Sequence, residues 1–155
     1  MIEDINTNDD SVVIRAHAHG LEAACPGCGV LSGRVHSGYV RRLADSPVGG
    51  RPVAIELRVR RFRCREGACP RATFAEQIDG LTFRYGRRSC GLQAVLRHVA
   101  LMLAGRAGAR LVVETLVSVV SRSTLLRLIR GMPDPEPATP RVLGVDEFAL
   151  RKGHV

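Results

Sequence analysis

The sequence predicts an α+β chain in which a small β-rich module precedes a unit of three short helices. Paired cysteines and a stretch of strict apolar–polar alternation at residues 51–63 predict the β-rich module. Apolar residues that recur at helical spacing from Leu92 onward predict the helices. A chain of 155 residues is long enough for one ordinary domain or two small ones.

The two cysteine pairs have the spacing of a tetrahedral metal site. Cys25 and Cys28 enclose Pro-Gly, and Cys64 and Cys69 enclose Arg-Glu-Gly-Ala. Structural Zn²⁺ takes four thiolate or imidazole ligands, and two short-spaced pairs on tight turns supply four thiolates. We therefore predict a structural zinc ribbon over residues 11–80, with these four cysteines as its ligands.

Two other uses of these cysteines stay open at this point. Two disulfides would require an oxidising compartment, but the first twenty residues are acidic and lack the apolar core of a secretory signal. A redox Cys-Pro-Gly-Cys motif needs no second pair, and the βαβ setting of a thioredoxin-like site is missing. Because no apolar run reaches membrane-spanning length either, we expect a cytoplasmic protein with reduced thiols.

Positive charge is concentrated in the middle of the chain. The formal net charge is +8, and residues 25–131 carry nineteen arginines against six acids, whereas residues 1–24 carry five acids and one arginine. An arginine-rich genome would explain why Lys152 is the single lysine, but not why the middle segment is so short of acids. This distribution favours nucleic acid as the partner.

The β-rich module is expected to begin after residues 1–10, which are polar and predicted to fray. Residues 11–18 alternate and predict a first strand. Residues 34–43 and 51–63 predict a hairpin across a loop at 45–50.

The second hairpin strand has two distinct faces. Its apolar face is predicted to contain Val53, Ile55, Leu57 and Val59, and a bulge is expected at Arg60-Arg61, where the alternation slips. Arg58 and Arg60 are predicted to lie on the outer face and to contact phosphates. A solvated basic face without a partner is the alternative of equal weight.

Residues 84–131 are predicted to form a helix-turn-helix unit after a connector at 70–88. The connector ends in a basic cluster, Arg84, Arg87 and Arg88. Three amphipathic segments follow, with Gly105 interrupting the first and second. Ser121 is placed to cap the third helix and Gly131 to end it. Three short helices with this spacing favour such a unit, although a plain three-helix packing unit stays open.

The third predicted helix has the division of faces that a recognition helix requires. Leu125, Leu128 and Ile129 share one face, which is predicted to pack on the core. The candidate DNA contacts are Arg122, Ser123, Thr124, Arg127 and Arg130. The first helical turn of such a unit reaches base edges, and arginine suits bidentate contact with guanine.

The remaining residues divide into a linker and a strand. Residues 132–140 contain four prolines and predict a stiff, extended linker. Residues 141–150 then predict a strand that carries Asp146.

The order of these parts resembles the transposases of the ISL-three family of bacterial insertion sequences. The stretches that carry the resemblance are Cys25-Pro-Gly-Cys-Gly29, Gly38-Tyr-Val-Arg-Arg-Leu43, Val59-Arg-Arg-Phe-Arg-Cys64, Gly105-Arg-Ala-Gly-Ala-Arg-Leu111, Val120-Ser-Arg-Ser-Thr-Leu-Leu-Arg127 and Val142-Leu-Gly-Val-Asp-Glu-Phe-Ala-Leu150. The resemblance implies a zinc ribbon, a helix-turn-helix that binds the terminal inverted repeats of the element in double-stranded DNA, and an RNase H-like catalytic domain. It places Asp146 at the first acid of an Asp-Asp-Glu triad.

Two departures from the family shape the expected function. Val117 stands in the turn before the third helix, where the family commonly has glycine. The family chain also continues for several hundred residues, so residues 141–155 are expected to be a stub of the catalytic domain. Mg²⁺ is then expected only for the full-length family member, because two-metal phosphoryl transfer needs several carboxylates.

We therefore expect a truncated transposase that binds the terminal inverted repeats and is inactive in catalysis by itself. A nucleoid-associated location in a bacterial cytoplasm and no membrane partner follow from this expectation, and a homodimer stays open. The alternative is a stand-alone DNA-binding regulator or repressor of transposition that occupies the same repeats. A protein-interaction module built on the zinc ribbon is a third option, which predicts no salt-sensitive DNA binding.

Catalysis provides the first test. The chain alone should neither nick nor join DNA with Mg²⁺ or Mn²⁺, because on a strand the side chains of Asp146 and Glu147 point to opposite faces. The measurement is nicking of a supercoiled plasmid that carries the terminal repeats, with Asp146→Ala as the control. Metal-dependent nicking that disappears in Asp146→Ala would contradict the expectation.

Overall fold

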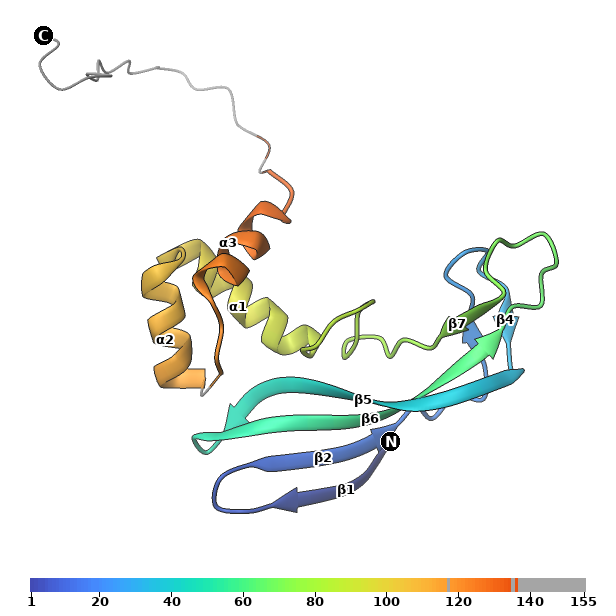
Figure 1. Cartoon of the computed structure of the whole chain (residues 1–155), viewed down its shortest axis with the longest axis horizontal. Coiled ribbons are helices and arrows are strands. Elements are labelled where there is room, and N and C mark those ends of the chain that lie inside the picture. Colours follow the sequence, from blue (N-terminus) through green and yellow to red (C-terminus); the bar gives the residue numbers. More distant parts are fainter. Residues whose placement is uncertain (117, 135, 137–155) are drawn as a thin grey trace, which may run out of the picture.

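The computed structural model describes residues 1–116, 118–134 and 136, and it has an N-terminal sheet followed by three helices (Figure 1). The predicted α+β class is therefore confirmed. The strands are β1 (Ile2–Thr7), β2 (Val12–His17), β3 (Ala23–Ala24), β4 (Leu31–Ser32), β5 (Val35–Val48), β6 (Arg51–Arg63) and β7 (Thr73–Ala75). The helices are α1 (Cys90–Leu103), α2 (Arg106–Leu116) and α3 (Arg122–Arg130).

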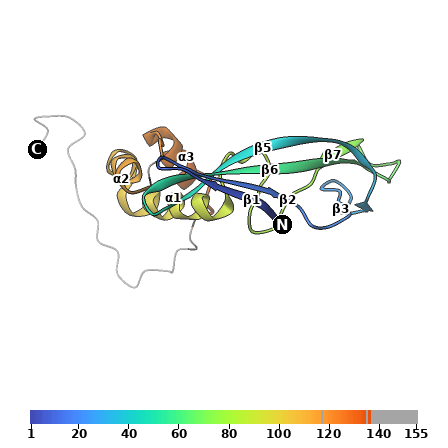
Figure 2. The ribbon, with the colours of Figure 1, turned by 90° about the horizontal axis from the view of Figure 1, so that it is seen from below.

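Strand β6 is the centre of the sheet. The strand order is β1-β2-β6-β5, and β7 pairs with the last residues of β6, while β3 and β4 form a separate small ladder. Strands β2 and β6 run parallel, and the other pairs are antiparallel. Seen from below, the sheet is a thin layer, with the helices gathered toward one end (Figure 2).

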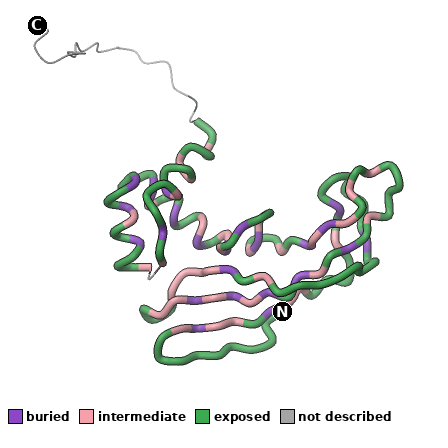
Figure 3. Tube along the Cα trace, in the orientation of Figure 1, coloured by how far each residue is buried: buried purple, intermediate pink, exposed green. Residues whose placement is uncertain are grey.

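The apolar face of β6 forms the core of the sheet, as its alternation predicts. Val53, Ile55, Leu57 and Val59 are all buried. Leu43 of β5 and Ala16 of β2 join this cluster, and the segment after β7 covers it through Ile78 and Leu81. Buried positions recur along β6, whereas β5 has one buried residue, Leu43, and β1 is exposed along its whole length (Figure 3).

The hairpin between β5 and β6 has a tighter turn than the sequence predicted. Val48 pairs directly with Arg51, so only Gly49 and Gly50 lie between the strands. Both glycines have positive φ, +58° and +73°, the backbone that a two-residue hairpin turn of right-handed twist requires. The expected loop at 45–50 is therefore wrong, because the two glycines allow β5 to continue to Val48.

The predicted irregularity near Arg60-Arg61 is present, but the extra residue lies on the partner strand. Val35 pairs with Phe62 and Ser37 with Arg61, so His36 has no opposite residue in β6. The alternation of β6 therefore continues through Arg60 and Phe62, and Val59 and Phe62 are buried in two different apolar clusters.

Two segments that were expected to lack structure are strands. Residues 2–7 form β1, which pairs with β2 and places Ile5 opposite Ile14. Residues 73–75 form β7 within the predicted connector. The expectation of fraying was wrong because an edge strand can be polar on both faces and still be held by its backbone ladder.

The three helices share one apolar core, and the third begins and ends where the sequence predicted. Ser89 caps α1 and Ser121 caps α3, each by accepting a hydrogen bond from a backbone N–H in the first turn. The buried residues of this core are Leu92, Leu96, Ala100, Val112, Val120 and Leu125. In the part of the chain that the structure describes, no helix is long and apolar enough to cross a membrane.

The helical unit is attached to the β5 end of the sheet. The backbone of Ala44 accepts a hydrogen bond from Ser89 and donates one to Arg87. The hydroxyl of Ser89 also donates to a carboxylate oxygen of Asp45 over 2.5 Å. Ala44 packs against the helical core as well, so the start of α1 is fixed to the sheet by both backbone and side chains.

The C-terminal predictions lie largely outside the described residues. The proline-rich linker at 132–140 is described only in part. Val117 and the strand at 141–155, including Asp146, are not among the described residues. These expectations therefore stay predictions.

Two glycines let α2 approach its neighbours closely. A Cβ atom on Gly108 would lie 3.0 Å from Cδ1 of Leu125 and 3.4 Å from Cγ1 of Val99. A Cβ atom on Gly105 would lie 3.4 Å from Cβ of Arg122. The small residues are therefore what permits the observed packing of α2 on α3.

This packing predicts opposite effects for two glycine substitutions. Gly108→Val should lower the free energy of unfolding by about 1–3 kcal/mol, because its methyl groups have no room beside Leu125. Gly91→Ala, whose Cβ would meet nothing closer than 3.7 Å, should be neutral or raise it by up to about 1 kcal/mol. Urea denaturation measures both, and equal stability of the two variants would contradict the close packing.

Candidate metal centre and nucleic-acid interface

The first cysteine pair lies on a tight turn between β3 and β4. The backbone N–H of Gly29 donates to the carbonyl of Cys25 over 2.8 Å, and that of Cys25 donates to Val30 over 3.0 Å. Gly29 has a φ of +76°, which explains why glycine follows Cys28. The turn directs both sulfurs to the same side.

The second cysteine pair follows directly from β6. Cys64 is the residue after the strand, and its N–H donates to the carbonyl of Ala72 over 3.0 Å. The turn closes through Glu66, whose carbonyl accepts from the N–H of Cys69 and whose carboxylate accepts from the N–H of Ala68. The long central strand thus carries Cys64 to a fixed position.

The four thiols converge on one point. The sulfur atoms of Cys25 and Cys69 are 3.9 Å apart, those of Cys28 and Cys64 are 3.5 Å apart, and all four lie within 4.8 Å of one another. Zinc–sulfur bonds of ~2.3 Å in a tetrahedron require sulfur atoms roughly 3.8 Å apart. A disulfide would need ~2.05 Å, and all five cysteines are free. The cluster therefore has the geometry of a structural zinc site.

Gly27 permits the two turns to meet. A Cβ atom on this residue would lie 3.2 Å from the sulfur of Cys69 and 3.0 Å from Cδ of Arg71. A side chain here would crowd the sulfur of Cys69, so the small size of Gly27 favours the close approach of the two turns.

The thiols shift one another's pKa values, as expected of a site that binds a cation. The pKa of Cys25 is lowered to about 7, first because the backbone N–H of Gly27 hydrogen-bonds to its sulfur, which outweighs desolvation. The N–H of Val30 lowers the pKa of Cys28, but desolvation and the neighbouring thiols raise it to about 12. One thiol thus loses its proton readily, and deprotonation of its neighbour is then less favourable. A bound dication would stabilise all four thiolates.

A very small apolar cluster lies beneath the metal site. It consists of Cys25, Phe62 and Phe74, with the two rings stacked at a centroid distance of 5.9 Å. The buried hydroxyl of Ser32 donates to the carbonyl of Arg63 and ties β4 to β6. Because so little apolar surface is buried here, metal ligation is the main source of cohesion available to this end of the molecule.

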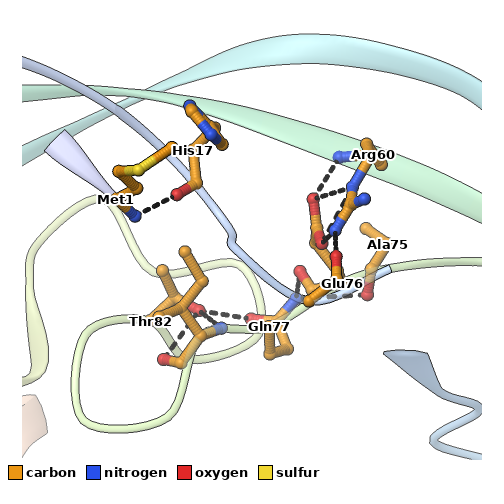
Figure 4. A network of polar contacts seen from close by, with 9 residues as sticks. Met1, His17, Arg60, Ala75, Glu76, Gln77 and Thr82 are labelled. Atoms are coloured by element: carbon orange, nitrogen blue, oxygen red, sulfur yellow. Dashed lines mark hydrogen bonds and ion pairs between the residues drawn. The ribbon is translucent and has the colours of Figure 1, made fainter. Parts of the chain in front are cut away.

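Arg60 is held inside the protein by an acid that the sequence did not reveal. Its guanidinium pairs with the Glu76 carboxylate, which is only 4% exposed, at 2.7 Å, and also donates to the carbonyl of Gly20 at 2.6 Å (Figure 4). The hydrogen bond to Glu76 is the largest cause that raises the pKa of Arg60. Arg60 therefore links Gly20, in the segment before the first cysteine turn, to the sheet. This role differs from the expected phosphate contact.

Arg58 lies on the open face of the sheet beside acids of β1. Its guanidinium is 3.6 Å from the carboxylate of Glu3, which also pairs with His17 at 2.6 Å. Next to it, Arg15 bridges Asp4 and Glu56. The acidic N-terminal segment thus neutralises much of the positive charge on this face.

The candidate contact residues of the third helix are mostly exposed. Arg122, Ser123, Arg127 and Arg130 are exposed, Thr124 is half-buried, and Leu125 is fully buried. Ser123, Arg127 and Arg130 have the spacing of one helical face. The hydroxyls of Ser123 and Thr124 lie 2.9 and 3.0 Å from that of Ser121, which caps the helix.

The helical unit carries uncompensated positive charge. Residues 84–131 contain nine arginines and one acid, Glu114, a net charge of +8. All ion pairs found among the described residues involve strand residues or Glu76, and none includes an arginine of this unit. The exposed face of α3 therefore presents cations with no acidic partner in the described structure.

Two features of the site escaped the sequence interpretation. Glu76 follows β7 at the position where Phe74 and Glu76 alternate inward, and an acid in such a pattern was the available signal. The adjacent acids Glu3 and Asp4 of β1 were assigned to a frayed end, because this segment lacks the period-2 alternation that marks a strand.

Comparison with known families identifies the metal-binding part. Residues 22–69 match the family described as the zinc-finger of transposase IS204/IS1001/IS1096/IS1165, the zinc ribbon of ISL3 (ISL-three) transposases. This segment contains all four clustered cysteines. No curated protein and no solved structure matches the chain.

The cluster predicts the metal content of cysteine variants. The purified protein should contain about one zinc per chain by elemental analysis, and Cys64→Ser should lose it and loosen the N-terminal half, because metal binding contributes to folding. Cys90, at the start of α1, lies outside the cluster, so Cys90→Ser is the matched control and should keep its zinc. A full zinc complement in Cys64→Ser would show that the ligand set is wrong.

Proposed function

We propose that this chain, whose residues 22–69 are the zinc ribbon of an ISL3-family transposase, binds double-stranded DNA through its three-helix unit. The target that fits this family is the pair of terminal inverted repeats of an insertion sequence. The observation that carries the proposal is the exposed, uncompensated basic face of α3. The proposal makes the protein a DNA-binding participant in transposition.

The arrangement of α2 and α3 supports a helix-turn-helix. The two helices are short, five residues separate them, and α3 is capped by Ser121 and packed through Leu125. In such a unit the second helix enters the major groove, and its outer face contacts base edges. On α3 that face contains Arg127 and Arg130, whose guanidinium groups suit the acceptor pair of guanine.

The ion pairs favour the helices over the face of the sheet that carries Arg15 and Arg58 as the main contact. The arginines of the open sheet face lie beside Glu3, Asp4 and Glu56, so a phosphate would compete with acids already in place. The arginines of the helical unit have no such competitors among the described residues. Phosphate attraction should therefore be strongest around α1 to α3.

In this proposal the zinc site has a structural role. The cysteine cluster lies at one end of β6 and the helical unit is attached near the other end of the hairpin (Figure 1). The metal would stabilise the sheet that carries the helices, and the family match spans the cysteine turns together with β5 and β6.

The proposal predicts that Arg127 contacts a base and contributes to the preference for one DNA sequence over another. Arg127→Ala should reduce the preference for terminal-repeat DNA over random DNA by about 1–3 kcal/mol, if the guanidinium contacts a guanine. Fluorescence anisotropy with both DNAs, across a range of salt concentrations, measures this preference. Binding to both should weaken steeply as salt rises.

Arg58→Ala is the matched control, because it removes the same charge from an exposed site, 66% exposed, on the sheet. It should weaken binding to both DNAs equally and only slightly. Equal weakening of both DNAs by Arg127→Ala would contradict its assignment as a base reader, and the absence of salt-sensitive DNA binding in the full chain would contradict the proposed function itself.

A further inference from the structure

A tight turn at residues 83–86 presents an aromatic ring to solvent immediately before α1. The N–H of Gly86 donates to the carbonyl of Phe83 over 3.0 Å, which closes a four-residue turn. Tyr85 occupies the third position with a φ of +60° and is 83% exposed. A turn of this kind favours glycine or asparagine at that position, so a tyrosine there is unusual.

The turn is held rigidly from several directions. The guanidinium of Arg41 donates to the carbonyls of both Phe83 and Gly86. Gly86 is buried, and a Cβ atom on it would lie 2.6 Å from the Phe83 ring. The backbone on its C-terminal side pairs with Ala44 of β5. The backbone position of Tyr85 is therefore set by the fold.

The ring belongs to a basic surface. The guanidinium carbon of Arg84 lies 4.7 Å from the ring centroid, and a guanidinium nitrogen lies 2.7 Å from the phenol oxygen. Arg84 and Arg87 are both exposed. Residues 80–113 contain six arginines and no acid, and neither Arg84 nor Arg87 has an ion pair among the described residues.

The folded state gains little from this tyrosine. A bulky residue at positive φ costs conformational energy, and a ring that is so exposed buries little apolar area in return. Backbone strain of this kind is typical of functional sites, where the benefit comes from a ligand. Nucleic acid combines what this surface would recognise, phosphate anions and flat aromatic bases.

We propose that the turn at residues 83–87 is a second DNA contact, in which Tyr85 stacks on a base exposed by an unpaired or distorted position. Arg84 and Arg87 pair with the flanking phosphates. One face of the ring is covered by Arg84, which leaves the other face for the base and places a cation next to the stack. The inference rests on the proposed function, because it takes DNA as the partner.

The test compares a fully paired duplex with the same duplex carrying one unpaired thymine. The zinc-loaded full chain should bind the second DNA about tenfold more tightly, as expected for one base–aromatic stack. Tyr85→Asn should bind both DNAs alike, and Tyr85→Phe, which keeps the ring, should retain the preference. Because asparagine tolerates positive φ, the Tyr85→Asn protein should have a Tm no lower than that of the parent.

A second readout reports on stacking directly. The chain has no tryptophan and only two tyrosines, so Tyr85→Trp introduces a single indole. Its fluorescence should be quenched when the duplex with the unpaired thymine is added, whereas that of Tyr39→Trp, on β5, should not change. An unchanged preference in Tyr85→Asn, or an indole at 85 that DNA does not quench, would overturn the second contact while leaving the proposed function intact. A full chain that binds neither duplex would overturn both.

Discussion

The convergence of four thiols on one point is the constraint on which the N-terminal part depends. Four sulfur atoms within 4.8 Å of one another are unfavourable as thiolates unless a cation neutralises them. The apolar cluster beneath them contains only Cys25, Phe62 and Phe74 among fully buried residues. With so small a core, the ends of β4 and β6 depend on metal ligation for their positions.

Strand β6 connects this constraint to the rest of the molecule. At one end it leads into Cys64, and along its length it pairs with β2, β5 and β7. At the other end of the hairpin, Ala44 and Asp45 of β5 hold the start of α1. Charge follows the same division in part: Arg15 and Arg58 on the open face of the sheet pair with acids, whereas no arginine of the helical unit has an acidic partner among the described residues.

Local patterns predicted much of this organisation. The cysteine spacing, the alternation of Val53 to Val59 and the cap at Ser121 are set by residues close in sequence, so they could be inferred without a structure. The features that were missed depend on distant partners. The polar strand β1 is defined by its pairing with β2, and the role of Arg60 depends on Glu76, sixteen residues away. The hairpin turn at Gly49 and Gly50 was hidden because its glycines lay inside a longer run of turn-forming residues.

The central claim is that DNA contacts the helical unit and leaves the open face of the sheet free. Amide hydrogen exchange of the zinc-loaded full chain, with and without terminal-repeat DNA, tests this claim most directly. The account predicts slower exchange in residues 118–131 and around the start of α1, with little change in β1 and β2. Protection of β1, β2 and β6 with no change in α3 would contradict it.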